Sequence, residues 1–415
     1  MRKKILLRGP VLTRSGYGEQ ARFALRSLRS RTDLWDIYIH PLQWGQTSWT
    51  NEYTEERLWI DKTIEKTARY VHEGGTFDVS LQVTIPNEWE KLAPINVGYT
   101  AGIETTKVAH QWIEKGNLMD KIIVVSTHSK NVYESTEYVG ETPTGEQVSI
   151  KLETPIEAVN YPVKIYENLA DIELDLTPEF NFLSLAQFGP RKNLPNTVQW
   201  FVEEFHDEEV GLVVKANIAK NCLLDREKLT MDLSAFLQKF PERKCKVYLL
   251  HGDMTDEEIH ALYLHQKINA FLSLPHGEGY GLPLFEAAYS GLPIVATGWS
   301  GQLDFLVDSD GVDRFYNVQF DLAPVQPEVV WDGVLIKESM WAYAREESAK
   351  RQMRNCYRAE TEAEGHLFKP CEYAVDLRER FNEDKLYKAF ADNVASLLID
   401  EDDELAYFER ANAGK

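Results

Sequence analysis

The sequence predicts an α/β protein made of two doubly wound domains, each a mostly parallel sheet with helices on both faces. Short apolar runs alternate with segments of helical periodicity along most of the 415 residues, which is the pattern of repeated βαβ units. The alternation is interrupted between 141 and 163 by a stretch richer in Thr, Pro and Glu, and it starts again at Phe180. The length allows two or three domains of ordinary size.

The first domain is expected over residues 1–165. Its strands are expected at the apolar runs Lys4–Arg8, Trp35–His40, Phe77–Val83, Ile95–Thr100 and Lys121–Val125. Its helices are expected at Glu19–Ser30, Glu55–Val71, Thr105–Glu114 and Ser129–Glu137. The segment Glu141–Val163 is expected to hold an edge hairpin and then the linker to the second domain.

The second domain is expected over residues 166–370. Its strands are expected at Phe182–Gln187, Gly211–Ala216, Lys246–His251, Ala270–Leu274 and Pro293–Thr297. Its helices are expected at Thr197–Phe205, Arg226–Phe240, Thr255–His265 and Pro283–Ser290. From Lys337 onward the sequence is helical and charged, and Leu386–Arg410 is expected to form a long helix broken near Asp400–Glu404.

The composition indicates a globular protein and excludes several functions. Hydrophobic residues make up 43% and charged residues 27% of the chain, which excludes wholesale disorder. The net charge of −21 argues against non-specific binding of nucleic acid or anionic membrane by the whole surface. No apolar run approaches the roughly 18 residues of a membrane span, and the basic start lacks a signal-peptide core. The four cysteines form no CxxC pair, so a cytoplasmic location is expected.

The charge is uneven, because residues 1–32 contain nine basic residues and one acidic residue, a net charge of +8. Arg22, Arg26 and Arg29 recur at the spacing of one helix face. Two interpretations stay open. The face is either simply solvated, or it docks an anionic acceptor such as phospholipid, lipopolysaccharide or DNA.

The segment most informative about chemistry is HGEGYGLPLFEAAYSGLPIVATGWSGQLD, residues 276–304. It follows a predicted strand, contains a glycine-rich turn and then opens a helix, with Pro283 where its missing N–H costs nothing. Glycine lets the backbone approach a ligand, and a helix N-terminus favours an anion, so a phosphate is the expected ligand. Glu286 in the first turn is placed to accept both hydroxyls of a ribose, and Glu278 to reach a second hydroxylated ring. Together these features predict a nucleotide-sugar site.

The run Glu278–Glu286, EGYGLPLFE, resembles the E-x7-E motif of retaining GT-B glycosyltransferases, specifically glycosyltransferase family four. The resemblance continues through AAYSGLPIVAT and Ser300–Asp304, where Asp304 replaces the family's usual Glu. It implies two Rossmann-like domains facing across a cleft, with the helical tail over residues 371–415 packing back on the first domain. It also implies that Glu278 contacts the donor sugar and Glu286 the donor ribose.

Further loops fit the same resemblance. The loop Phe188–Asn193 resembles the one whose Arg and Lys neutralise the donor diphosphate, with Lys192 matching the Lys and Arg191 substituting for an Arg that the family places earlier. The loop Ser15–Gly18 resembles the N-terminal Gly-rich loop that faces the donor phosphates and the acceptor. The donor-binding residues that the motif and the resemblance imply are Gly16, Gly18, Gly279, Tyr280, Gly281, Leu282, Glu286, Gly301 and Gln302.

The loop Tyr99–Thr106 resembles a strand-to-helix loop in which many family members place a His facing the reacting carbon. This chain has no His there, and Glu104 is the nearest polar candidate. His276, beside the motif, is either a site residue or a packed structural one, and His251 is a weak candidate for the base pocket. The resemblance and the residues together imply four catalytic residues, Glu278, Lys192, Arg191 and Glu104.

The predicted activity is transfer of a hexose from a nucleoside-diphosphate sugar to an acceptor hydroxyl, with retention at the anomeric carbon. UDP and GDP are the favoured donor nucleotides. No cluster of His, Cys, Asp and Glu shows metal-ligand spacing, so neither a metal nor a cofactor is expected beside the donor.

Alternatives stay open for both activity and acceptor. A nucleotide-sugar epimerase or a phosphorylase shares the two-domain cleft, and the missing His keeps open a nucleotide-sugar-binding protein without turnover. The acceptor is a glycan, a lipid-linked sugar or a modified phage DNA base. The last arises because SLQVTIPNEWE and IVVSTHSKNVYESTEY resemble glycosyltransferase-like proteins of marine phages, which would place the protein in the host cytoplasm.

Overall fold

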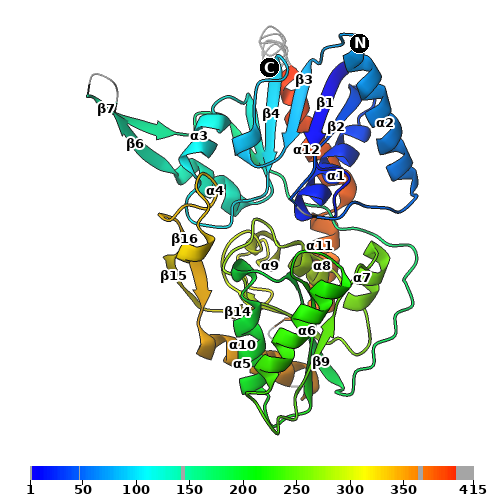
Figure 1. Cartoon of the computed structure of the whole chain (residues 1–415), viewed down its shortest axis with the longest axis vertical. Helices are drawn as coiled ribbons and strands as arrows, with labels where there is room; N and C mark the ends of the chain where they lie inside the picture. Colours follow the sequence, from blue (N-terminus) through cyan, green and yellow to red (C-terminus); the bar gives the residue numbers. More distant parts are fainter. Residues whose placement is uncertain (1, 46, 142–144, 363–367, 399–415) are drawn as a thin grey trace, which may run out of the picture.

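The computed structural model describes residues 2–45, 47–141, 145–362 and 368–398, and two parallel sheets flanked by helices form its body (Figure 1). One sheet has the strand order β2-β1-β3-β4-β5-β8 and the other β11-β10-β9-β12-β13-β14. Neighbouring strands are parallel throughout both sheets. The second order is that of a Rossmann fold and the first is a closely related doubly wound order. The predicted fold class is therefore confirmed.

The first domain contains the first sheet and a projecting hairpin. Its sheet strands are β1 (Lys3–Gly9), β2 (Trp35–Pro41), β3 (Val79–Val83), β4 (Ile95–Thr100), β5 (Lys121–Val124) and β8 (Ile156–Ala158). Its helices are α1 (Gly16–Arg29), α2 (Glu55–His72), α3 (His110–Gly116) and α4 (Thr127–Ser135). The expected edge hairpin is present as β6 (Glu137–Glu141) and β7 (Gln147–Lys151), which stands away from the body of the domain (Figure 1).

The second domain contains the second sheet and its own hairpin, β15 (Phe320–Pro324) and β16 (Met340–Ala344). Its sheet strands are β9 (Phe180–Gln187), β10 (Val210–Asn217), β11 (Lys246–Leu250), β12 (Ala270–Ser273), β13 (Ile294–Thr297) and β14 (Tyr316–Val318). Its helices are α5 (Leu194–Glu204), α6 (Leu223–Leu237), α7 (Asp256–Tyr263), α8 (Leu282–Tyr289), α9 (Leu303–Leu306) and α10 (Glu346–Thr361). None of the helices in the described ranges is long and apolar enough to cross a membrane.

Local sequence signals explain where several helices begin. Ser15, Thr54 and Ser126 are N-cap residues in extended conformation, and each hydroxyl accepts a hydrogen bond from the backbone N–H three residues later. Helix α8 follows Gly281, whose φ of 94° suits glycine, and has Pro283 in its first turn. Both domains thus place the start of a helix directly after the carboxyl end of a strand, where ligands of such sheets bind.

Two expected elements differ in the structure. The helix expected over Thr105–Glu114 begins only at His110, because Thr106 bonds instead to Met340. The Thr106 N–H donates to the Met340 carbonyl (3.2 Å), and the Met340 N–H donates to Thr106 Oγ1 (3.0 Å). Met340 begins β16, a strand in the region from Lys337 onward where the sequence predicts helix.

The C-terminal helices return from the second domain to the first, as expected. Helix α11 (Pro370–Arg380) lies against α8, and α12 (Glu383–Ala395) lies against α1 (Figure 1). Phe390 of α12 packs on Phe23 (ring centroids 5.3 Å apart) and on Tyr99 (4.9 Å). A short 3-10 turn ends the tail at Leu398, and the rest of the helix expected up to Arg410, with its break, lies outside the described residues.

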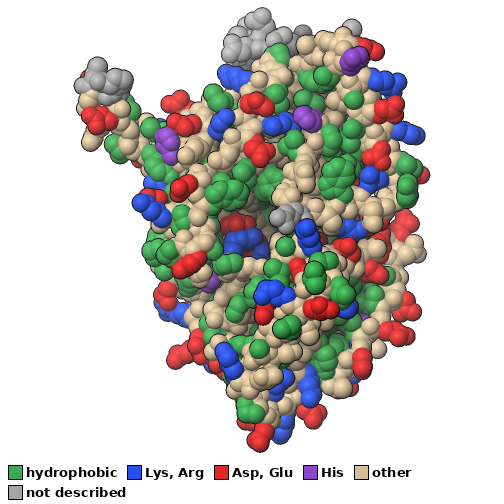
Figure 2. Space-filling view, in the orientation of Figure 1, with side chains coloured by type: hydrophobic (Ala, Val, Ile, Leu, Met, Phe, Trp, Pro, Cys, Tyr) green, Lys and Arg blue, Asp and Glu red, His purple; other side chains and the backbone are tan. Residues whose placement is uncertain are grey.

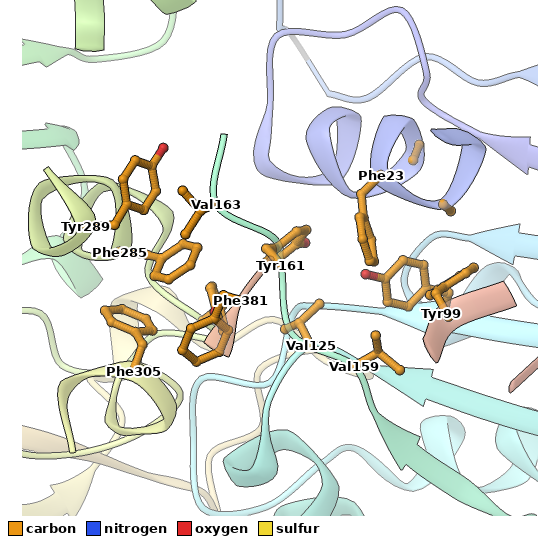
Figure 3. Packing of buried hydrophobic residues seen from close by; sticks show 14 of the residues in the cluster. Phe23, Tyr99, Val125, Val159, Tyr161, Val163, Phe285, Tyr289, Phe305 and Phe381 are labelled. Carbon is orange, nitrogen blue, oxygen red and sulfur yellow. The ribbon is translucent and has the colours of Figure 1, made fainter. Parts of the chain in front are cut away.

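One hydrophobic core runs through both domains where they meet. Figure 3 shows Phe23, Tyr99 and Tyr161 on one side, continuing into Phe285 and Phe381 on the other. All five side chains are almost completely buried. The domains are therefore fixed against each other by apolar packing, which determines the geometry of the space between them.

Candidate active site

A cleft of about 910 Å³ lies between the two domains. Figure 2 shows it as a hollow near the middle of this face, with Lys or Arg and Asp or Glu side chains inside. Its walls come from the loop between β1 and α1, the loop after β4, and the loops after β9, β10, β11 and β12. Because these loops follow the carboxyl ends of parallel strands, the cleft is at the position where open α/β sheets bind ligands.

The four predicted catalytic residues meet in this cleft as one charged cluster. Arg191 Nε lies 2.8 Å from Glu104 Oε2, and Arg191 Nη1 lies 2.9 Å from Glu278 Oε2. Lys192 Nζ pairs with the other oxygen of Glu278. Glu104 comes from the first domain and the other three come from the second. The cluster, called here the Glu104–Lys192 network, therefore joins both walls of the cleft.

The loop after β9 holds the two cations of this network in place. Pro190–Lys192 forms a 3-10 turn that ends at Asn193, whose φ of 53° is left-handed. The Arg191 carbonyl accepts a hydrogen bond from the His276 N–H (2.8 Å), and Arg191 Nη1 donates to the Gly277 carbonyl (2.7 Å). The cations are thus tied to the glycine-rich loop before α8 by backbone contacts as well as by charge.

Burial and charge oppose each other in this network. Burial favours the neutral form of Glu278, but Arg191 and Lys192 outweigh it and hold the pKa of that carboxyl below its ordinary value. For Glu104 burial prevails over Arg191 and raises the pKa. Burial, reinforced by Arg191, lowers the pKa of Lys192. The network is therefore a largely buried set of opposite charges in direct contact.

Glu286, the predicted ribose contact, lies at the other side of the α8 N-terminus. Its Oε2 accepts a hydrogen bond from Tyr263 Oη (3.1 Å). Burial raises the pKa of Glu286 to about 7, and Lys164 only partly offsets this effect. Lys164 Nζ itself lies 3.0 Å from both Glu19 Oε1 and Asp256 Oδ2, so it links α1 to α7 across the cleft.

The start of α8 separates Glu278 from Glu286. The first N–H groups of a helix have no partner within the helix, and the helix dipole makes this end partly positive. Gly281 and Leu282 line the cleft at this point. An anion placed here would meet the helix N-terminus together with Lys192 and Arg191, which is a site suited to a phosphate group.

Several motif glycines permit close contact between chain segments and leave no space for a ligand. A Cβ on Gly279 would lie 1.9 Å from the Ala101 carbonyl oxygen, and a Cβ on Gly277 would lie 2.1 Å from that of Glu104. Both contacts cross from the second domain to the first. Gly18 packs in the same way on the Thr13 carbonyl, whereas Gly16 faces the open cleft.

Two residues predicted to bind the donor, Gly301 and Gln302, are not among those that line the cleft. Gln302 is fully buried and bonds to Ser300 and to the Thr297 carbonyl, and the Gly301 N–H donates to the Glu278 carbonyl (3.0 Å). Tyr280 reaches the cleft wall, but its ring is packed among Phe285, Phe305 and Tyr161. These residues hold the glycine-rich loop in shape.

The neighbouring Asp304 fastens the two domains together. Its Oδ2 accepts hydrogen bonds from the Thr127 N–H at the start of α4 (2.8 Å) and from Asn160 Nδ2 (2.8 Å). Beside it, Ser126 Oγ donates to the Gly279 carbonyl (2.6 Å). The position that resembles the family's Glu is therefore an interdomain contact in this chain.

Both candidate histidines bond to groups within the protein. His276 is buried, with Nδ1 2.9 Å from the Ala342 carbonyl oxygen and its ring stacked on Trp341. His251 Nε2 lies 2.9 Å from Asp225 Oδ1. Asp225 in turn accepts hydrogen bonds from three N–H groups in the loop after β10, so His251 contacts that loop through Asp225.

The arginine face of α1 is neither freely solvated nor an open docking surface. Arg26 pairs with Glu56 (2.8 Å) and Glu19 (3.1 Å), and Arg22 also pairs with Glu19 (3.1 Å). Arg29 lies over the ring of Trp59, 4.5 Å from its centroid. Two of the three arginines are thus paired with carboxylates, one of which lies in α2, and the third lies over an aromatic ring.

Some cleft residues carried no recognisable sequence signal. Lys164 sits in the interdomain linker, and Trp44, which also lines the cleft, sits in the loop after β2, outside every motif. Lys215 had one available signal, since it is a charged residue near the end of a buried strand. Its Nζ donates to the Gly252 carbonyl (2.6 Å) at the cleft wall. Within the described ranges, no group of three or more His, Cys, Asp or Glu residues is arranged to hold a metal ion.

Comparison with known proteins gives a fold and no family. No family model and no curated protein matches the chain. Sucrose-phosphate synthase from Thermosynechococcus elongatus superposes with a TM-score of 0.59 and 10% identity, over 96% of this chain and 99% of that one. HepE from Anabaena, solved with UDP-glucose, superposes with a TM-score of 0.58 and 11% identity, over 95% of this chain and 100% of that one. A glycosyltransferase from Rickettsia africae superposes with a TM-score of 0.59 and 11% identity, over 96% of this chain and 100% of that one.

These likenesses extend over nearly the whole of each chain. At such low identity they show the arrangement of the two domains. The chain has the GT-B fold, in which two Rossmann-like domains face each other across a cleft.

Proposed function

We propose that the protein is a glycosyltransferase that moves a hexose from a nucleoside-diphosphate sugar to an acceptor hydroxyl. The observation that carries this proposal is the Glu104–Lys192 network at the N-terminus of α8. Two cations, a helix N-terminus and two carboxylates in one cleft suit a ligand that combines a diphosphate with a hydroxylated ring.

The donor diphosphate takes Lys192 and Arg191 from their carboxylate partners. A diphosphate carries more charge than one carboxylate and can also use the N–H groups at the start of α8. Glu278 is then released to accept hydrogen bonds from the donor hexose. Glu286 accepts from the ribose hydroxyls, 8 residues further along the same segment. The base lies toward Lys215 and the loop after β11, and UDP and GDP are the nucleotides proposed. The UDP-glucose bound in HepE supports a donor of this kind.

Transfer proceeds with retention. The bond between the anomeric carbon and the diphosphate oxygen breaks, the acceptor oxygen bonds to the same face of that carbon, and the acceptor proton passes to the departing diphosphate. Lys192, Arg191 and the helix N-terminus stabilise the negative charge that grows on the leaving group. Glu104 lies where the first domain meets this cluster, and we assign it the position beside the reacting carbon. No step of this scheme uses a metal ion.

The test measures nucleoside diphosphate release from UDP- and GDP-linked hexoses, with and without acceptor, and the anomeric configuration of the product by NMR. Release that depends on Lys192 and is insensitive to EDTA supports the proposal. Tight nucleotide-sugar binding without product across acceptors would identify a binding protein instead. Loss of activity in EDTA that divalent metal restores would overturn the metal-free scheme.

A further inference from the structure

We propose that the acceptor is a neutral saccharide whose ring stacks on Trp44 at the first-domain wall of the cleft. This inference rests on the proposed function, because it names the class of acceptor for the same site. Three observations support it: an aromatic pair, the position of that pair beside the Glu104–Lys192 network, and the pairing of each arginine in that wall with a carboxylate.

The aromatic pair consists of Trp44 and Tyr17. Their ring centroids are 4.1 Å apart and their planes meet at 27°, so the two rings are stacked. Both rings line the cleft. A pyranose ring presents a face of C–H groups and an edge of hydroxyls, and a flat aromatic surface in a water-filled cleft binds such a face. An indole also brings an N–H group for a sugar hydroxyl.

The pair lies next to the reacting groups. Tyr17 Oη is 2.7 Å from Thr100 Oγ1 at the end of β4, and Tyr17 Oη also accepts a hydrogen bond from the Ala101 N–H (3.4 Å). The loop that starts there continues to Glu104, which pairs with Arg191. A ring stacked on Trp44 therefore stands on the acceptor side of the network, opposite the donor residues of the second domain.

The charges around the pair favour a neutral ligand. Four arginines of the first domain line the cleft, and each has a carboxylate partner. Arg14 pairs with Glu52, and Arg57 with Asp61 at 3.0 Å. Arg22 and Arg26 pair with Glu19. A phosphodiester or an anionic lipid would have to displace a carboxylate from each of these arginines, whereas a neutral sugar leaves all the pairs intact.

Two more aromatic residues follow Trp44 in the sequence. The side chain of Trp49 is 50% exposed and that of Tyr53 is 93% exposed. Trp49 is fixed by its backbone, which forms an antiparallel bridge with Thr13 beside the cleft. Neither residue lines the cleft, so the acceptor contact assigned here rests on Trp44 and Tyr17.

The experiment offers the full-length protein to an array of neutral and acidic oligosaccharides, to a single-stranded DNA oligonucleotide and to vesicles containing phosphatidylglycerol. The best neutral glycan is then titrated by calorimetry. Trp44→Ala is expected to weaken its binding at least tenfold, and Trp44→Phe to keep most of the wild-type affinity. Trp331→Ala, which removes a 62% exposed tryptophan of the second domain, is the matched control and leaves binding unchanged.

Binding restricted to acidic glycans, DNA or vesicles would overturn the inference, and so would an absence of neutral-glycan binding or neutral binding that Trp44→Ala does not change. Calorimetry with UDP- and GDP-sugars on the same variants separates this outcome from a failure of the proposed function. If the donor binds and is turned over while neutral glycans do not bind, only the acceptor class is wrong. If no nucleotide sugar binds, the proposed function itself fails.

Discussion

At the scale of single residues, Lys192 is the group whose loss is expected to cost most activity. It pairs with Glu278 in the free protein and is assigned to the leaving diphosphate during transfer. Lys192→Ala should lower kcat by about 10²–10³, because the charge that this ammonium stabilises grows in the transition state. The measurement is steady-state release of nucleoside diphosphate.

The control for this prediction is Lys220→Ala, which removes an exposed lysine of the same domain. It should leave kcat unchanged. A Lys192→Ala protein that keeps its kcat and loses only donor affinity would show that the ammonium acts equally on the bound donor and on the transition state.

Glu286 makes the stability of the protein depend on pH. Its pKa is about 7 in the folded chain, raised from 4.5 by burial. Between these values the folded chain holds a proton that the unfolded chain has released, so this residue's contribution to the free energy of unfolding falls as pH rises through the window. Glu286→Gln should flatten that fall in thermal melts taken from pH 4.5 to 8, whereas Glu227→Gln on an exposed position of α6 should not.

The ionised form of Glu286 is also the better acceptor for ribose hydroxyls. The donor dissociation constant should therefore decrease as pH rises through about 7 in the wild type, and should stay level in Glu286→Gln. A donor affinity that is independent of pH in both proteins would remove Glu286 from the ribose site.

Sequence reasoning located the chemistry of single residues better than their contacts. Glu278, Glu104, Arg191 and Lys192 were expected at one site, and they meet there because their loops all follow carboxyl ends of strands. Gln302 was expected in the cleft and is buried. The spacing of the arginines in α1 indicates one shared face, but it does not reveal Glu56, their partner in another helix.

At the scale of elements, the glycine-rich loop before α8 joins the two domains. Gly279→Ala would place its Cβ 1.9 Å from a backbone oxygen of the first domain, which cannot rotate away. The domains must then separate locally, and a destabilisation of about 1–3 kcal/mol is expected for such overpacking, together with reduced turnover. Denaturant unfolding and small-angle scattering measure both effects.

Gly189→Ala is the control for that substitution. Gly189 has an extended backbone, and a Cβ there would meet open space. It should fold with unchanged stability and compactness. Equal stability of both variants would mean that the loop after β4 moves away without cost, and that close contact with the first domain is not the reason for glycine at position 279.

The elements that were predicted well are those with strong local signals. Most sheet strands and most of the expected helices stand within a few residues of their expected positions, because buried parallel strands are continuous apolar runs. The start of α3 and the strand β16 were not anticipated. The start of α3 follows the contact between Thr106 and Met340, and β16 forms by pairing with β15; no local sequence pattern shows either pairing.

At the scale of the whole molecule, the shared core couples the two domains. Phe381 follows α11, and its ring packs on Phe285 of α8 with centroids 5.2 Å apart. Its carbonyl accepts a hydrogen bond from the Val163 N–H (2.8 Å) in the linker. The tail therefore packs against residues of both domains before α12 reaches α1 (Figure 3). A core that extends across both sheets predicts that they unfold together.

Phe381→Ala tests this coupling, because it removes a buried ring from the junction and leaves both sheets intact. A loss of about 3–5 kcal/mol is expected for a cavity of this kind. The calorimetric trace should change from one transition in the wild type to two in the variant, since each domain then melts with its own core. Val375→Ala, on an exposed position of α11, should change stability by no more than about 0.5 kcal/mol. Two separate transitions already present in the wild type would contradict the coupling. The geometry of the cleft would then depend on ligands rather than on the shared core.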